Sequence, residues 1–113
     1  MKIRIKHNGQ ILFENIQAAN SMTSRLIGLM FRSSPSGDGL LLDPCNSIHT
    51  FFMRYPLDVV FLGKNNQVVK IIRNLRPWKM TWIYFKARKV LETPSGKLAN
   101  DLKEGDTLEV EHV

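Results

Sequence analysis

The stretch Cys45-Asn-Ser-Ile-His-Thr-Phe-Phe-Met-Arg-Tyr-Pro-Leu-Asp-Val-Val-Phe-Leu62 does more than any other part of the chain to indicate the fold. Four polar side chains lie in it among large apolar ones: His49, Thr50, Arg54 and Asp58. A polar group inside an apolar segment costs roughly 1–3 kcal/mol unless it is hydrogen-bonded, so these residues mark either a bonded structural corner or a site. Pro56 interrupts the segment, and we therefore expect two strands, residues 47–53 and 57–62, separated by a corner.

Short strands separated by turns are also expected in the rest of the chain. Lys2-Ile-Arg-Ile-Lys6 alternates with period two, and Asn8-Gly9 is typical of a type I′ turn into a second strand at residues 10–13. Further strands are predicted at residues 40–42, 68–72, 90–93 and 107–113, while residues 77–85 read as strand pieces or as a packed irregular loop. Many short strands with turns about every ten residues predict a mainly β single domain, a β-sandwich or barrel.

Two short helices complete the expected fold. Apolar residues recur at helical spacing between Met22 and Met30, after a cap at Asn20 or Ser21. We expect Met30 and Phe31 to pack this helix onto the sheet, and Arg32 to face outward or to reach a carboxylate. Residues 97–103 form the second expected helix, which Gly105 ends.

Composition is that of an ordinary globular protein. The 113 residues fit one domain, residues 1–113, and 43% hydrophobic with 23% charged residues give an adequate core without metals or disulfides. Cys45 is the only cysteine, so an internal disulfide is excluded. No apolar run approaches the roughly 18–20 residues of a membrane span, and the first residues lack the apolar core of a signal peptide. A cytoplasmic protein without a cofactor is the default expectation.

The net charge of +6 is unevenly distributed. Between Asp58 and Glu92 every charged residue is basic, whereas acidic residues predominate from Leu91 onward. A basic middle could attract an anionic partner. It could equally be one half of a surface that the acidic C-terminal part neutralises after folding.

Four segments in this order and spacing carry a family resemblance: Gly28-Leu-Met-Phe-Arg32, Ser47-Ile-His-Thr-Phe-Phe-Met-Arg-Tyr-Pro-Leu-Asp-Val-Val-Phe61, Lys86-Ala-Arg-Lys-Val-Leu-Glu92 with Gly96, and Gly105-Asp106. Over roughly residues 11–108 the chain resembles DUF192, a family of small bacterial and archaeal proteins of unknown function. The resemblance implies a compact, mostly β domain with jelly-roll-like character and one or two short helices. It implies no catalytic residues, because none are established for the family.

Enzymatic chemistry is the first of the alternatives that the residues leave open. A small hydrolase or transferase could use His49 with Asp58 or with Cys45, since a thiolate needs a nearby base to react at neutral pH. A spacing of four residues along a strand covers about 13 Å, however, so Cys45 and His49 meet only if the chain folds back. A metal site is poorly supported, because the ligand types are not clustered.

A structural role is the alternative interpretation of the Pro56 corner. Arg54 and Asp58 flank it and could form an ion pair that holds two strands, or Arg54 could bind a ligand carboxylate or phosphate. Because Leu57 and Val59 flank Asp58, we expect its carboxylate to be buried and bonded to backbone amides or to Arg54.

Aromatic and basic residues interleave between Arg76 and Lys89, as in surfaces that stack on single-stranded nucleic acid. No nucleic-acid-binding motif accompanies them, and Trp78 and Trp82 are expected to be core or loop-anchoring residues. Specific nucleic-acid binding is therefore not the leading hypothesis. The sequence favours a binding or accessory module for a small anionic ligand or a protein, with a cleft between residues 47–62 and 78–85 as its surface. The candidate ligand-binding residues are His49, Thr50, Arg54, Asp58, Trp78 and Trp82.

Overall fold

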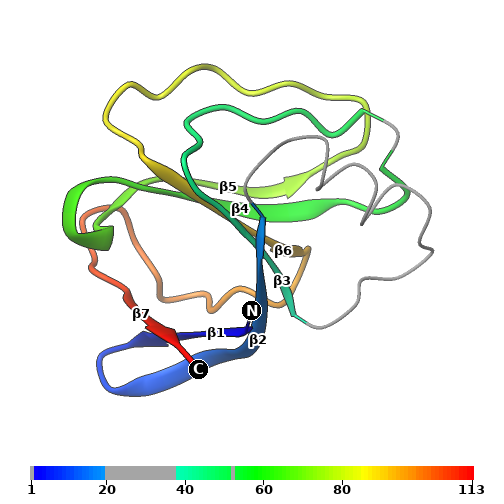
Figure 1. The fold of residues 1–113 in the computed structure, drawn as a ribbon. Coiled ribbons are helices and arrows are strands. Elements are labelled where there is room, and N and C mark those ends of the chain that lie inside the picture. The colour runs from blue at the N-terminus through cyan, green and yellow to red at the C-terminus, as the bar shows by residue number, and fades with distance from the viewer. Residues whose placement is uncertain (1, 20–37, 52) are drawn as a thin grey trace.

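Seven strands and one 3-10 helix make up the part of the chain that the computed structural model describes, residues 2–19, 38–51 and 53–113 (Figure 1). The strands are β1 (Lys2–His7), β2 (Gln10–Ala19), β3 (Gly39–Leu42), β4 (Leu57–Leu62), β5 (Val68–Leu75), β6 (Lys89–Pro94) and β7 (Glu109–His112). The 3-10 helix, η1, spans Lys64–Asn66 between β4 and β5. The expected helix between residues 22 and 30, with its packing residues Met30 and Phe31 and the neighbouring Arg32, lies outside the described residues.

All seven strands belong to one sheet with the order β5-β4-β6-β3-β2-β1-β7. Neighbours are antiparallel except β2 and β3, which run parallel. The sheet curls so that β1, β2 and β7 lie across from β4, β5 and β6 (Figure 1). Two hydrogen bonds connect the start of the edge strand β5 with the segment before the other edge strand, β7. The Val68 N–H donates to Asp106 O at 2.7 Å, and the Leu108 N–H donates to Asn66 O at 3.0 Å. The expected mainly β, single-domain fold is confirmed, as one curled sheet that does not close into a barrel.

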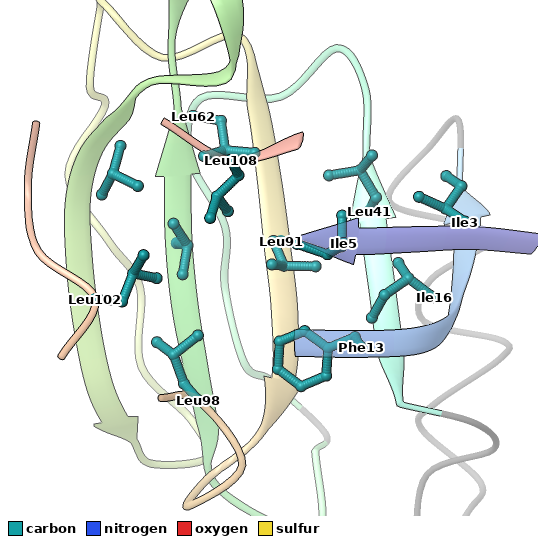
Figure 2. Packing of buried hydrophobic residues seen from close by; sticks show 12 residues of the cluster. Ile3, Ile5, Phe13, Ile16, Leu41, Leu62, Leu91, Leu98, Leu102 and Leu108 are labelled. Atoms are coloured by element: carbon teal, nitrogen blue, oxygen red, sulfur yellow. The ribbon is translucent and has the colours of Figure 1, made fainter. Parts of the chain in front are cut away.

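One hydrophobic cluster fills the inside of the curl (Figure 2). The period-two pattern of β1 places Ile3 and Ile5 there, while Arg4 and Lys6 point to the outer surface. β4, β6 and the loop before β7 contribute Leu62, Leu91 and Leu108 from the facing side. The Asn8-Gly9 turn that sets this register has φ values of 52° and 78°, as a type I′ turn requires.

A second cluster covers the opposite face of the central strands. Every residue of β4 is buried: Val60 and Leu62 belong to the first cluster, and Val59 and Phe61 belong to the second. The loops at residues 43–56 and 76–88 cover this face, with Ile48, Met53 and Ala87 as buried contributors. The sequence of a strand that is buried on both faces is almost continuously apolar, as in Leu57–Leu62, where Asp58 is the one polar residue.

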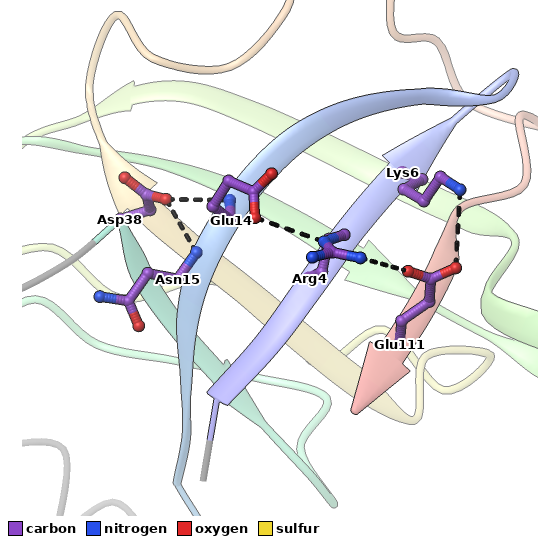
Figure 3. A network of polar contacts seen from close by, with 6 residues as sticks. All are labelled: Arg4, Lys6, Glu14, Asn15, Asp38 and Glu111. Carbon is purple, nitrogen blue, oxygen red and sulfur yellow. Dashed lines mark hydrogen bonds and ion pairs between the residues drawn. The ribbon is translucent and has the colours of Figure 1, made fainter. Parts of the chain in front are cut away.

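Ion pairs join the outer faces of β1, β2 and β7 (Figure 3). Arg4 contacts Glu14 at 3.3 Å and Glu111 at 3.4 Å, and Lys6 contacts Glu111 at 3.6 Å. Glu111 therefore neutralises bases at the start of the chain, and the basic middle has only the longer Lys70–Glu104 pair, at 3.9 Å, among the described ion pairs.

The expected strand at residues 47–53 is wrong. Among its described residues, His49 forms the one bridge, to Met80, and the backbone groups of Ile48 and Thr50 bond to the irregular loop at residues 78–81 rather than to a strand.

The expected helix at residues 97–103 is also wrong. Leu98 and Leu102 have helical spacing and are buried, but in a series of turns that crosses the first cluster. Arg73 donates to the carbonyls of Leu98 and Ala99, at 3.3 and 2.7 Å, and the Lys103 N–H donates to the Asp106 carboxylate at 3.0 Å. These bonds occupy groups that a helix would pair internally.

Candidate functional site: an exposed aromatic segment

Five large apolar side chains project from one loop between β5 and β6, residues 76–88, which we call the aromatic segment. The exposed fractions are 59% for Trp78, 66% for Met80, 83% for Trp82, 54% for Ile83 and 87% for Phe85. Single exposed apolar residues are normal on protein surfaces, but five large ones within residues 78–85 indicate an interaction surface. The segment is therefore the strongest candidate for a functional site among the described residues.

The backbone of the aromatic segment is held by Thr50, whose side chain is completely buried. The Thr50 hydroxyl donates to Arg76 O at 2.6 Å and accepts from the Lys79 N–H at 2.9 Å. The Thr50 N–H donates to Lys79 O at 2.8 Å, and Thr50 O accepts from the Trp78 N–H at 2.9 Å. Thr50 thus fixes the first turn of the segment.

Further hydrogen bonds fix the remainder of the segment. The Thr81 N–H donates to Ile48 O at 2.9 Å, and its hydroxyl oxygen accepts from the Ile48 N–H at 3.0 Å. The Tyr84 N–H donates to Asn46 O at 3.0 Å. The apolar side chains are consequently exposed on an ordered backbone, which limits the conformational entropy lost when a partner binds.

Aromatic contacts support the segment from beneath. The His49 ring stacks on Phe51 with centroids 4.8 Å apart, and Phe51 stacks on Trp78 at 6.0 Å. Tyr84 faces inward and packs on Phe61 at 4.6 Å. Trp78 itself has φ of 66°, a left-handed conformation that is rare for a bulky residue and is found most often at functional sites.

The charge at the segment is positive. Arg76, Lys79, Lys86 and Arg88 are all exposed, and none of them takes part in a described ion pair. Among the described residues, these four bases therefore form no direct ion pair with the acidic C-terminal part. The surface presents apolar groups and positive charge together.

An open pocket of about 300 Å³ lies at the end of the segment. Its lining includes Lys64, Gln67, Phe85, Lys86 and Arg88, so three bases surround it without an acidic residue. We call it the basic pocket. A second open pocket, of about 450 Å³, is lined by residues 43–46 together with Ala87 and Arg88.

The structure separates Asp58 from this surface. Its carboxylate is buried and accepts from the Asn74 N–H at 2.8 Å, the Gly96 N–H at 3.0 Å and the Ser95 hydroxyl at 3.3 Å. Burial and bonding to backbone amides are confirmed. The expected ion pair is wrong, because Arg54 is exposed and donates none of these bonds.

This arrangement does not bring Asp58 or Cys45 into the roles that the enzyme hypothesis gives them. Both Asp58 oxygens stabilise turns, so Asp58 does not orient His49 as a catalytic carboxylate would. The Cys45 thiol donates to Ser47 O at 3.1 Å. Across residues 2–19, 38–51 and 53–113, no three His, Cys, Asp or Glu side chains gather as a metal site would require.

The sequence predicts a cleft between residues 47–62 and 78–85; the hydrogen bonds above join residues 46–50 directly to the segment, and a cleft along the remainder stays a prediction. Of the predicted site residues, His49, Thr50 and Trp78 come together there, and Trp82 lies on the same segment. Of the two roles expected for the tryptophans, core or loop-anchoring, the core role is wrong for both, since both are mostly exposed. Sequence reasoning missed Met80, Ile83, Phe85 and the basic pocket. The spacing of two between Trp78, Met80 and Trp82 could have predicted that these side chains share one side of the segment, because residues two apart face the same side of an extended chain.

The fold and the site together define the class of protein: a small, mainly β domain that carries an exposed loop of aromatic and basic residues. The family model DUF192, described as "Uncharacterized ACR", matches residues 3–110. The chain belongs to this family.

Two relatives of known sequence agree with this assignment, and a solved structure agrees with the fold. The chain is 35% identical to a UPF0127 protein of Pyrococcus horikoshii over 72% of its own length and 73% of the relative's. It is 33% identical to a UPF0127 protein of Pyrococcus furiosus, over 83% and 84% of the two lengths. A solved structure of a protein of unknown function from Novosphingobium aromaticivorans is 24% identical, with a TM-score of 0.77 covering 96% of this chain and 84% of the other. That likeness shows the fold.

Proposed function

We propose that residues 1–113 act as one non-enzymatic binding module and that the aromatic segment recognises an anionic macromolecular partner. The observation that carries this proposal is the exposure of five large apolar side chains on a hydrogen-bonded backbone, beside four bases that form no ion pair with the other described residues. Burying one such side chain against a partner contributes about 1.5–3 kcal/mol. A surface of this kind is therefore able to supply useful affinity with few residues.

The arrangement of the site favours binding over catalysis. The titratable residue beneath the segment, His49, is stacked on Phe51, and the Asp58 carboxylate accepts from the backbone amides of Asn74 and Gly96. A cytoplasmic location, expected from the lack of any disulfide requirement, belongs to the same proposal. A helix long and apolar enough to cross a bilayer is absent from the described residues.

Tryptophan emission tests the proposal directly, because both tryptophans of the chain lie in the aromatic segment. We would titrate the protein at about 0.15 M salt, where the Debye length is roughly 8 Å, with four polyanions. These are a single-stranded oligonucleotide, heparin, polyglutamate and vesicles that contain anionic lipid. We expect at least one of them to shift the emission to shorter wavelength and to bind Ile83→Ser/Phe85→Ser at least about tenfold more weakly.

The matched control is Ile11→Ser, which removes an exposed apolar side chain from β2. It should bind like the parent. If none of the four polyanions changes the emission, or if Ile11→Ser weakens binding as much as the segment variant, the proposed recognition surface is wrong. For the oligonucleotide we expect only weak association that disappears near physiological salt, because phosphate contacts alone weaken steeply as salt rises.

A further inference from the structure

We propose that the partner is a lipid bilayer surface that carries anionic headgroups, with the aromatic segment inserted at the level of the headgroups. This inference rests on the proposed function and names its partner. Peripheral binding of this kind needs exposed apolar side chains beside bases, and it needs no helix that spans the membrane. The aromatic segment supplies both features on one loop.

The mixture of exposed side chains favours lipid over nucleic acid. Trp82 and Phe85 could stack on bases, but Met80 and Ile83 offer no ring face and are still more than half exposed. At a membrane interface all four have a role, because aliphatic groups enter the acyl boundary and tryptophan favours the headgroup level. The composition of the segment is thus better matched to a bilayer than to a single strand.

The position of the bases also fits a bilayer surface. Lys79 lies among the apolar side chains in the sequence, Lys86 follows Phe85 directly, and Arg88 comes two residues after Lys86. Bases at this level would contact anionic headgroups while the neighbouring apolar groups insert, since an anionic leaflet attracts Lys and Arg within about a Debye length. Two of the acidic C-terminal residues are engaged with other bases, Glu111 with Arg4 and Lys6 and Glu104 with Lys70.

The basic pocket gives the surface a place for one headgroup. Phe85 lines it together with Lys64, Lys86 and Arg88, so insertion of Phe85 would bring these three bases to headgroup level. A phosphate group in the pocket would accept charge-assisted hydrogen bonds from them. Binding should therefore depend on the pocket bases as well as on the apolar side chains.

Co-sedimentation with vesicles tests the inference. We would compare vesicles of equal parts phosphatidylcholine and phosphatidylglycerol with vesicles of phosphatidylcholine alone, using the full chain. The protein should bind the anionic vesicles and bind the neutral ones at least about tenfold more weakly. Trp82→Ala and Phe85→Ala should each weaken binding to anionic vesicles by about tenfold or more. Lys86→Gln/Arg88→Gln should lower it by about tenfold at low salt.

Matched controls are available elsewhere on the surface. Ile11→Ala and Lys97→Gln remove an exposed apolar group and an exposed base outside the segment, and both should bind vesicles like the parent. Circular dichroism would confirm that each variant is folded. If the protein binds heparin, polyglutamate or the oligonucleotide but not anionic vesicles, the lipid inference is overturned and the recognition surface stands. Binding to vesicles that survives all three segment variants would also overturn it.

Discussion

Replacing Asp58 with alanine is expected to lower the free energy of unfolding by about 3 kcal/mol or more. The carboxylate is buried and accepts three hydrogen bonds, two of them from the backbone amides of Asn74 and Gly96. Its removal leaves these donors without a partner at the point where β5 ends and the turn after β6 begins. Urea unfolding, followed by far-ultraviolet circular dichroism, would measure the change.

Two further variants make the Asp58 experiment specific. Asp58→Asn retains the oxygen that can accept from Asn74 and Ser95 but loses the acceptor for Gly96, so its destabilisation should be smaller than that of Asp58→Ala. Asp101→Ala removes an exposed carboxylate and should change stability by no more than about 0.5 kcal/mol. An unfolding curve for Asp58→Ala that coincides with the parent's would contradict the structural role given to this residue.

Gly39→Ala should have the largest effect of any single methyl group added to the sheet. Gly39 begins β3 with φ of 151°, and a Cβ atom there would overlap the Glu92 carbonyl oxygen. The oxygen belongs to the backbone of β6, so the strand pair itself would have to shift. Strain and overpacking together predict a loss of about 4 kcal/mol or more, enough to leave a large fraction of the protein unfolded.

Gly9→Ala is the matched control for Gly39→Ala. It also places a side chain at positive φ, 78°, but no atom lies within 4 Å of the added Cβ. Its cost should therefore be the backbone term alone, about 1 kcal/mol. Equal destabilisation of the two variants in thermal melts would show that the close approach of β3 and β6 is not what requires glycine at residue 39.

Local patterns in the sequence were enough to predict much of the sheet. The alternation in Lys2–His7 and the apolar run in Leu57–Leu62 each reflect which faces of a strand are buried, and the structure confirms both strands. The Asn8-Gly9 turn followed from its own dihedral preferences. Residues 97–103 show where such reasoning fails. Arg73, from β5, donates to the Ala99 carbonyl, and the Asp106 carboxylate accepts from the Lys103 N–H, so backbone groups that a helix would pair with each other are already bonded to side chains outside these residues.

The candidate site could be predicted only in part, because burial depends on contacts between distant segments. The interleaved aromatic and basic residues were visible in the sequence, and so was the difficulty of placing Thr50 in an apolar run. Their relation was not visible: the Thr50 side chain binds the backbone of Arg76 and Lys79 and so turns Trp78 and its neighbours outward. Interleaved aromatic and basic residues are equally compatible with a loop whose aromatic side chains are packed inside, so the sequence pattern alone does not predict their exposure.

The aromatic segment as the recognition surface is the central claim, and oxidative footprinting with mass spectrometry tests it most directly. Hydroxyl radicals modify exposed tryptophan, methionine and phenylalanine side chains, so in the free protein Trp82, Met80 and Phe85 should react rapidly and the buried Met53 and Phe61 slowly. With anionic vesicles present, the account predicts protection of the segment and no change at Ile11. Slow reaction of the segment in the free protein, or protection that falls elsewhere on the surface, would contradict it.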